Sequence, residues 1–86
     1  MTSVTIGLDL GDRYSRYCTV DAEGTIQQEG RVQTNRASLH KLLSHQERAR
    51  VVLEVGTHSP WVSRQIEQMG HEVVVANPHH TFTTAC

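Results

Sequence analysis

The sequence predicts one α/β domain with a mixed sheet and the element order β-β-β-α-β-α-β. Three observations support this prediction: apolar residues alternate with period two near the start, the period becomes helical after residue 34, and two apolar runs flank a second helical segment. A length of 86 residues allows a single domain. Because a β-α-β crossover joins parallel strands, we expect the first strand to be central and the fourth to lie beside it.

The first three strands are predicted from alternation and from turn residues. Apolar side chains alternate with other residues over 4–10, and Gly-Asp-Arg at 11–13 supplies a turn. β-forming residues at 16–20 lead into Asp-Ala-Glu-Gly at 21–24, which is typical of a hairpin loop. Residues 25–32 are more polar, as expected for an exposed edge strand.

A helix and a buried strand are predicted next. Thr34 or Asn35 can cap the helix, in which leucines recur at positions i, i+3 and i+4. The apolar run at 50–55 contains a single carboxylate and predicts a strand buried on both faces.

The second helix is expected to begin with Ser59 as its cap and Pro60 at its first position, and to end at Gly70. Residues 71–76 predict another buried strand, which the following Asn-Pro stops.

Composition excludes several classes of protein. The chain is 37% hydrophobic and 20% charged with a formal net charge of -1, which is typical of a globular chain rather than a disordered or fibrous one. There is no basic leader and no apolar run of about 18 residues, so we expect a cytoplasmic location and no membrane partner. The two cysteines are far apart, which predicts a buried Cys18, an incidental thiol at Cys86 and no disulfide framework.

Asp9 and Glu54 are the candidate catalytic and metal-binding residues. Asp9 ends the first strand, and Glu54 interrupts an apolar run in which an unpaired charge would be costly to bury. If the two strands are parallel neighbours, their backbones lie about 4.8 Å apart and the carboxylates can share one divalent cation. Mg²⁺ suits a few carboxylates with retained waters, and it can assist a phosphodiester displacement. The alternative role for Asp9 is to cap the turn at Gly11.

Arg13 and Trp61 are the candidate nucleic-acid-binding residues. Arg13 lies in the turn beside Asp9, where it can contact a phosphate. Trp61 follows Pro60 in the second helix, where it either packs against the core or stacks on a base at the lip of the site. The six histidines show no zinc-site spacing and are expected to face solvent.

Three segments carry a resemblance to a known family: IGLD at 6–9, LE at 53–54 and MGHEVVVANP at 69–78. Together they resemble the amino-terminal segment of DEDD-type, RuvC-like transposases, the insertion-sequence family that includes Piv-type invertases and bridge-RNA-guided recombinases. The resemblance implies a ribonuclease-H-like fold in which four acidic residues hold Mg²⁺ for DNA strand cleavage and exchange. Asp9 matches the first of these acids and Glu54 the second. DNA and guide RNA are the implied partners.

The resemblance is incomplete at its carboxyl end. The third and fourth acids, a basic helix and a serine-bearing domain have no counterpart, and His79-His80 stands where the basic helix would begin. Residues 1–78 are therefore interpreted as a partial RuvC-like domain, truncated before its carboxy-terminal helices, and 79–86 as a tail outside the family pattern. We expect no strand exchange by this chain alone, and self-association through strands left uncovered.

Two alternative functions are compatible with the sequence. One is a non-catalytic remnant or interaction module that binds full-length transposase or nucleic acid. The other is the nucleotide-binding half of an actin-like ATPase, because DLGDRYS at 9–15 also resembles the first phosphate loop of actin-like and sugar-kinase ATPases. The ATPase interpretation gives no role to Glu54.

Overall fold

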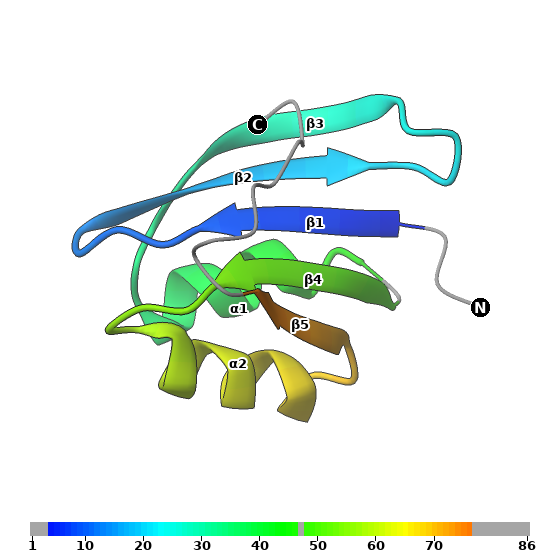
Figure 1. Cartoon of the computed structure of the whole chain (residues 1–86). Coiled ribbons are helices and arrows are strands. Elements are labelled where there is room, and N and C mark those ends of the chain that lie inside the picture. Colours follow the sequence, from blue (N-terminus) through cyan, green and yellow to red (C-terminus); the bar gives the residue numbers. More distant parts are fainter. Residues whose placement is uncertain (1–3, 47, 77–86) are drawn as a thin grey trace.

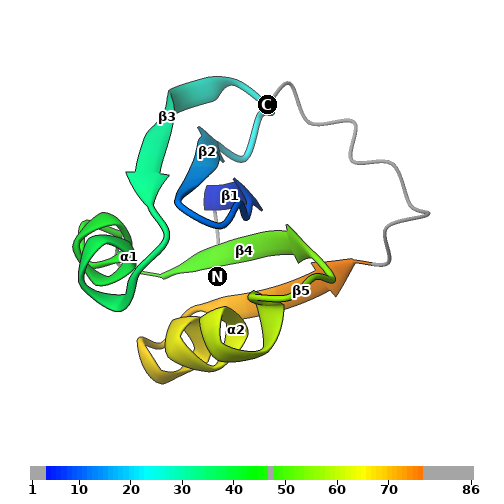
Figure 2. The ribbon, with the colours of Figure 1, turned by 90° about the vertical axis from the view of Figure 1, so that its left-hand side faces the viewer.

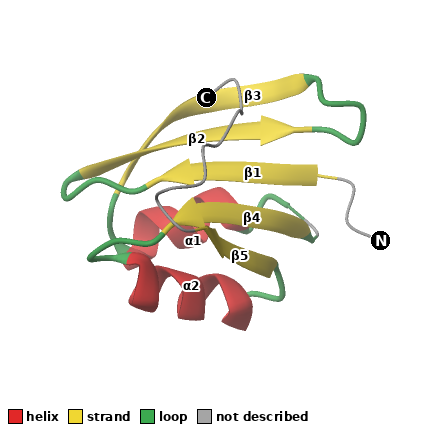
Figure 3. Ribbon diagram, in the orientation of Figure 1, coloured by secondary structure: helices red, strands yellow, loops and turns green. Residues whose placement is uncertain are grey.

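Seven elements make up residues 4–46 and 48–76, the part of the chain that the computed structural model describes. They follow the predicted order β-β-β-α-β-α-β (Figure 1, Figure 3). The elements are β1 (Val4–Asp9), β2 (Tyr14–Val20), β3 (Ile26–Gln33), α1 (Arg36–Leu43), β4 (Ala49–Glu54), α2 (Ser59–Gln68) and β5 (Glu72–Ala76).

The strands form one mixed sheet in the order β3-β2-β1-β4-β5. The β1–β2 and β2–β3 pairs are antiparallel, whereas the β1–β4 and β4–β5 pairs are parallel. β1 is therefore central with β4 beside it, as predicted, because α1 carries the chain from the edge strand β3 across to the other side of β1. The register of the β2–β3 pair shifts between Thr19 and Val20.

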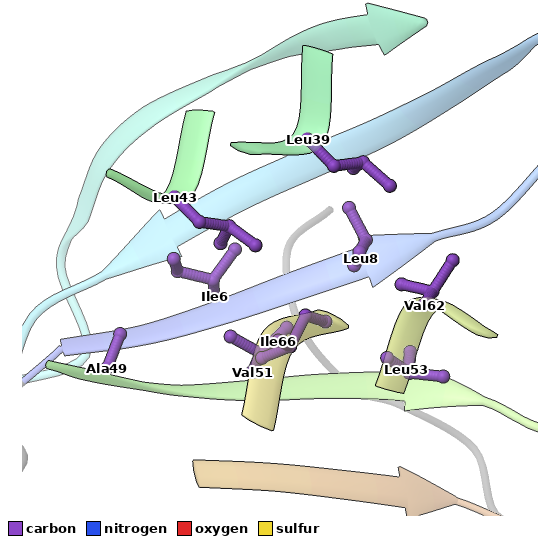
Figure 4. Close-up of a cluster of buried hydrophobic side chains, with 9 residues drawn as sticks. All are labelled: Ile6, Leu8, Leu39, Leu43, Ala49, Val51, Leu53, Val62 and Ile66. Carbon is purple, nitrogen blue, oxygen red and sulfur yellow. The ribbon is translucent and has the colours of Figure 1, made fainter. Parts of the chain in front are cut away.

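Both helices pack against the same face of the sheet (Figure 2), where side chains of β1 and β4 meet those of α1 and α2 (Figure 4). Burial of each large apolar side chain stabilises the fold by about 1.5–3 kcal/mol, so this one interface holds the domain together. The buried cluster consists of Ile6, Leu8, Leu39, Leu43, Ala49, Val51, Leu53, Val62 and Ile66. The face opposite the helices, here called the far face, carries the intervening strand residues, among them Asp9, Arg16, Arg31, Arg50 and Glu54.

The expectations that β4 is buried on both faces and that β5 is a buried strand are wrong. Along β4, buried residues alternate with the exposed Arg50 and Glu54. In β5, Val74 and Val75 are 40% and 41% exposed, because β5 is an edge strand. A run of apolar residues does not show which faces of a strand are covered, and the two described helices cover only one face of this sheet.

The helix ends agree in part with the sequence. Asn35 caps α1, and its side chain accepts the amide hydrogen of the residue three positions on, at 2.8 Å. The prediction that Ser59 caps α2 is wrong, since His58 is the N-cap and Ser59 is the first helical residue. The Ser59 hydroxyl instead bonds both backbone groups of Gly56. Gly70 follows α2 with φ of 89°, a conformation that favours glycine, as predicted for the helix end.

His71 lies before β5 rather than in it, and it is buried. Its Nδ1 accepts a hydrogen bond from the Ala49 amide at 2.9 Å, and its Nε2 donates one to the Leu43 carbonyl at 3.1 Å. The expectation that the histidines face solvent is thus wrong for His71, which joins the end of α1 to the start of β4.

Cys18 is fully buried in β2, as predicted. It is disulfide-bonded, which the cysteine spacing did not predict. The predicted Asn-Pro stop, the tail at 79–86 and Cys86 lie outside the described residues. None of the helices in residues 4–46 and 48–76 is long and apolar enough to cross a membrane.

Candidate functional site

Asp9 and Glu54 come together at one edge of the sheet. Asp9 is the last residue of β1 and Glu54 the last of β4, and the two strands run parallel with Leu8 opposite Leu53. Their carboxyl ends are therefore side by side, which is where ligands bind in open α/β sheets. The structure thus places the two predicted acids on adjacent strand ends.

Alternation along each strand explains why these carboxylates are accessible. Leu8 and Leu53 point into the helix-covered core, so the next residue on each strand, Asp9 or Glu54, points to the far face. Both acids are exposed, and Glu54 therefore buries no charge. Within residues 4–46 and 48–76 neither carboxylate has a hydrogen-bond or ion-pair partner, so the structure shows no capping of the Gly11 turn by Asp9.

The two acids line a small cavity of about 140 Å³ between the β1–β2 turn and the β4–α2 loop. We call this cavity the carboxylate pocket. It is lined by Asp9, Leu10, Asp12, Glu54, Val55, Gly56, Thr57 and His58. This cavity has room for a hydrated ion or one phosphate group.

A hydrogen-bonded chain closes one side of the carboxylate pocket. Asp12 Oδ1 lies 3.1 Å from His58 Nε2, and Trp61 Nε1 donates to His58 Nδ1 at 3.1 Å. Because the indole can only donate, Nδ1 of His58 must accept, which leaves the proton on Nε2 for Asp12. The chain ties the loop after β1 to the loop after β4.

Asp12 and His58 were not predicted as site residues. Their side chains come from loops far apart in the sequence, and loop conformation is not readable from hydrophobic period. Their positions in the sequence could have identified them, because each residue closely follows one of the two predicted acids at the same edge of the sheet.

Arg13 and Trp61 lie near the carboxylate pocket but are not among the described residues that line it. Arg13 is exposed in the β1–β2 turn, and its carbonyl accepts the Thr34 amide at 2.8 Å. Trp61 is half-buried and packs against the core cluster, with the Arg36 guanidinium 5.8 Å from its ring centroid. A packing role therefore accounts for Trp61, whereas Arg13 is available to a ligand.

The donor set fits Mg²⁺ as part of a site. Mg²⁺ is commonly bound through one or two carboxylates, with waters and substrate phosphates completing its octahedral shell. Asp9 and Glu54 are unpartnered carboxylates that line the same pocket, and Asp12 lines it as well. No cluster of three or more histidine, cysteine, aspartate or glutamate side chains in residues 4–46 and 48–76 has the geometry of a complete protein-ligated metal site.

Comparison with solved structures identifies the fold. The chain is similar to T. thermophilus RuvC, solved in complex with a Holliday junction substrate, with a TM-score of 0.67 and 14% sequence identity over 90% of this chain. The chain has a RuvC-like, ribonuclease-H-like fold. It spans 66% of that RuvC chain. A second similar structure, the Aquifex aeolicus Ppx/GppA phosphatase, has a TM-score of 0.45 at 15% identity, over 88% of this chain and 36% of the other.

No protein-family model and no curated protein sequence matches this chain. The RuvC-like fold therefore rests on three-dimensional similarity, which at this identity establishes architecture alone. In this RuvC-like fold the carboxylate pocket occupies the edge where β1 and β4 end.

Proposed function

We propose that this chain is the amino-terminal part of a DEDD-type transposase, in which Asp9 and Glu54 hold Mg²⁺ for the cleavage and exchange of DNA strands. The observation that carries the proposal is the parallel β1–β4 register, which brings two unpartnered acids from distant segments into one pocket. The RuvC-like fold and the resemblance in the segments at 6–9, 53–54 and 69–78 support it.

The residues of this chain would have distinct tasks in that reaction. Asp9 and Glu54 supply carboxylate oxygens from rigid strand ends, so their spacing is set by the sheet rather than by a loop. The Asp12–His58 hydrogen bond holds the two flanking loops together and so maintains the wall of the pocket. Mg²⁺ bound here would stabilise negative charge on the attacking and leaving oxygens of a phosphodiester.

This chain supplies two of the four acids that the resemblance implies. A divalent ion bound by two carboxylates keeps most of its shell as water, so we expect weak Mg²⁺ binding. For the same reason we expect no cleavage or joining of DNA by the 86-residue chain when it is incubated alone with Mg²⁺.

Titration with paramagnetic Mn²⁺, followed by two-dimensional amide NMR, tests the metal site. Amide signals around Asp9 and Glu54 should broaden first, because paramagnetic relaxation falls steeply with distance from the ion. D9N and E54Q should each weaken Mn²⁺ binding at least about tenfold. Changing a residue that only hydrogen-bonds to a metal ligand can already weaken metal binding by that much, and these two substitutions change the proposed ligands themselves.

The matched control is E29Q, which removes an exposed carboxylate from β3. Broadening in E29Q should equal that in the wild type. Broadening that survives unchanged in both D9N and E54Q, or that centres on another part of the chain, contradicts the proposed metal site. Mg²⁺-dependent cutting or joining of DNA by the unmodified chain contradicts its assignment as an incomplete enzyme.

A further inference from the structure

Three charged residues lie in one row across the far face of the sheet. Asp9 on β1 is in register with Arg16 on β2, and Arg16 is in register with Arg31 on β3. Residues opposite one another on neighbouring strands point to the same face. The two arginines lie on the two strands of one hairpin, and the hairpin register brings them opposite one another beside the carboxylate pocket.

The row holds two positive charges that the described part of the protein does not neutralise. Arg16 and Arg31 are exposed, and within residues 4–46 and 48–76 neither has a carboxylate within 4.0 Å. Asp9 lies opposite Arg16, and Glu29 lies two residues from Arg31 on the same strand, yet neither forms an ion pair. Like charges directly opposite one another destabilise a sheet, so an anion bound between the arginines would relieve a repulsion.

Tyr14 holds Arg31 in place on this face. The Arg31 guanidinium lies 4.2 Å from the centroid of the Tyr14 ring, and Tyr14 is itself 43% exposed. A guanidinium stacked on an aromatic ring keeps its N–H groups free at the edges, and its reduced freedom lowers the entropic cost of binding. Arg31 is therefore preorganised to donate hydrogen bonds to an external acceptor.

We infer that Arg16 and Arg31 form a phosphate-binding row, which binds the backbone phosphates of the DNA strand that enters the carboxylate pocket. Neighbouring strands are about 4.8 Å apart, so Arg31 lies about 10 Å from Asp9 across β2. That span lets the row bind phosphates beside the one at Asp9 and Glu54. That the bound DNA strand is the substrate of the carboxylate pocket rests on the proposed function. Binding of DNA by the two arginines is measured separately.

Fluorescence anisotropy with a labelled DNA duplex, titrated at several salt concentrations without divalent ions, tests the row. R16Q and R31Q should each lower affinity about tenfold, as expected for losing a charged hydrogen bond. Each should also reduce the magnitude of the slope of log K against log salt by about 0.9, the value for one phosphate contact. R16K and R31K should recover part of the affinity, because lysine binds phosphate as a point charge.

The matched control is R50Q. Arg50 is an exposed arginine on the same face, but it lies at the opposite end of β4 from Glu54 and pairs with Glu72 at 2.8 Å. R50Q should bind DNA as the wild type does. Equal losses in R16Q, R31Q and R50Q, or unchanged binding in R16Q and R31Q, overturn the inference, as does a wild-type chain that binds no DNA at low salt.

Two further arms separate this inference from the proposed function. An RNA duplex of the same sequence should bind no more tightly than DNA, and loss of RNA binding alone in R16Q and R31Q would overturn the assignment to DNA. D9N and E54Q should retain DNA binding without metal. If Mn²⁺ causes no broadening around Asp9 and Glu54 but R16Q and R31Q still lose DNA affinity, the metal site is refuted and the row is supported. If Mn²⁺ causes that broadening but R16Q and R31Q keep their DNA affinity, only the row is refuted.

Discussion

At the scale of single residues, His71 is the side chain on which the joint between α1 and β4 depends. H71A should lower the free energy of unfolding by about 2–4 kcal/mol, because a buried amide at Ala49 and a buried carbonyl at Leu43 each lose a partner. Urea unfolding followed by circular dichroism measures this loss. H45A, which removes an exposed histidine, should change stability by less than about 0.5 kcal/mol. Equal effects of the two substitutions would refute the role given to His71.

At the scale of elements, the turn between β2 and β3 is organised around the hydrogen-bonded carboxylate of Asp21. Hydrogen bonds from the amides of Thr25 and Glu23 and from the Gln27 side chain hold the pKa of Asp21 below its ordinary value of 3.8. A carboxylate whose pKa is lowered by folding stabilises the fold above its unfolded pKa, and this contribution is lost as pH falls through the folded pKa.

D21N keeps an acceptor oxygen for the two amides but cannot ionise, so its stability should lack this pH-dependent part. The advantage of the wild type over D21N in urea unfolding should be full at neutral pH and should shrink as pH falls below 3.8. E23Q, an exposed change in the same turn, is the control and should retain the wild-type pH profile. An advantage that stays constant with pH would contradict the stabilising role of the Asp21 charge.

At the scale of the whole molecule, one edge of the sheet is apolar and accessible. Val74 and Val75 on β5 are 40% and 41% exposed, and an exposed apolar edge strand favours pairing with another chain. Sedimentation velocity should show the wild type associating with rising concentration. The double variant V74T/V75T should remain monomeric, and I26T, at the opposite edge where Ile26 is 40% exposed, should still associate. A compact wild-type monomer at all concentrations would contradict this prediction.

Some of this architecture could be predicted from sequence because its causes are local or topological. The order of elements follows from hydrophobic period, and the meeting of Asp9 with Glu54 follows from strand ends and the β-α-β crossover rule. The Arg16–Arg31 row depends on a hairpin register that residues 21–24 alone do not set. The Asp12–His58 bond depends on the conformation of two loops, and the exposure of β5 depends on its place at the edge of the sheet.

The carboxylate pocket can form during folding only once β4 has paired with β1. β1, β2 and β3 follow one another through short turns, and closing short loops costs little entropy, so these strands can pair early. Glu54 reaches Asp9 only after β3 and α1 have been made and β4 has docked. A chain emerging from the ribosome therefore displays Asp9 alone. An ion shared by Asp9 and Glu54 would hold β4 to β1, and its binding would favour the folded sheet by mass action.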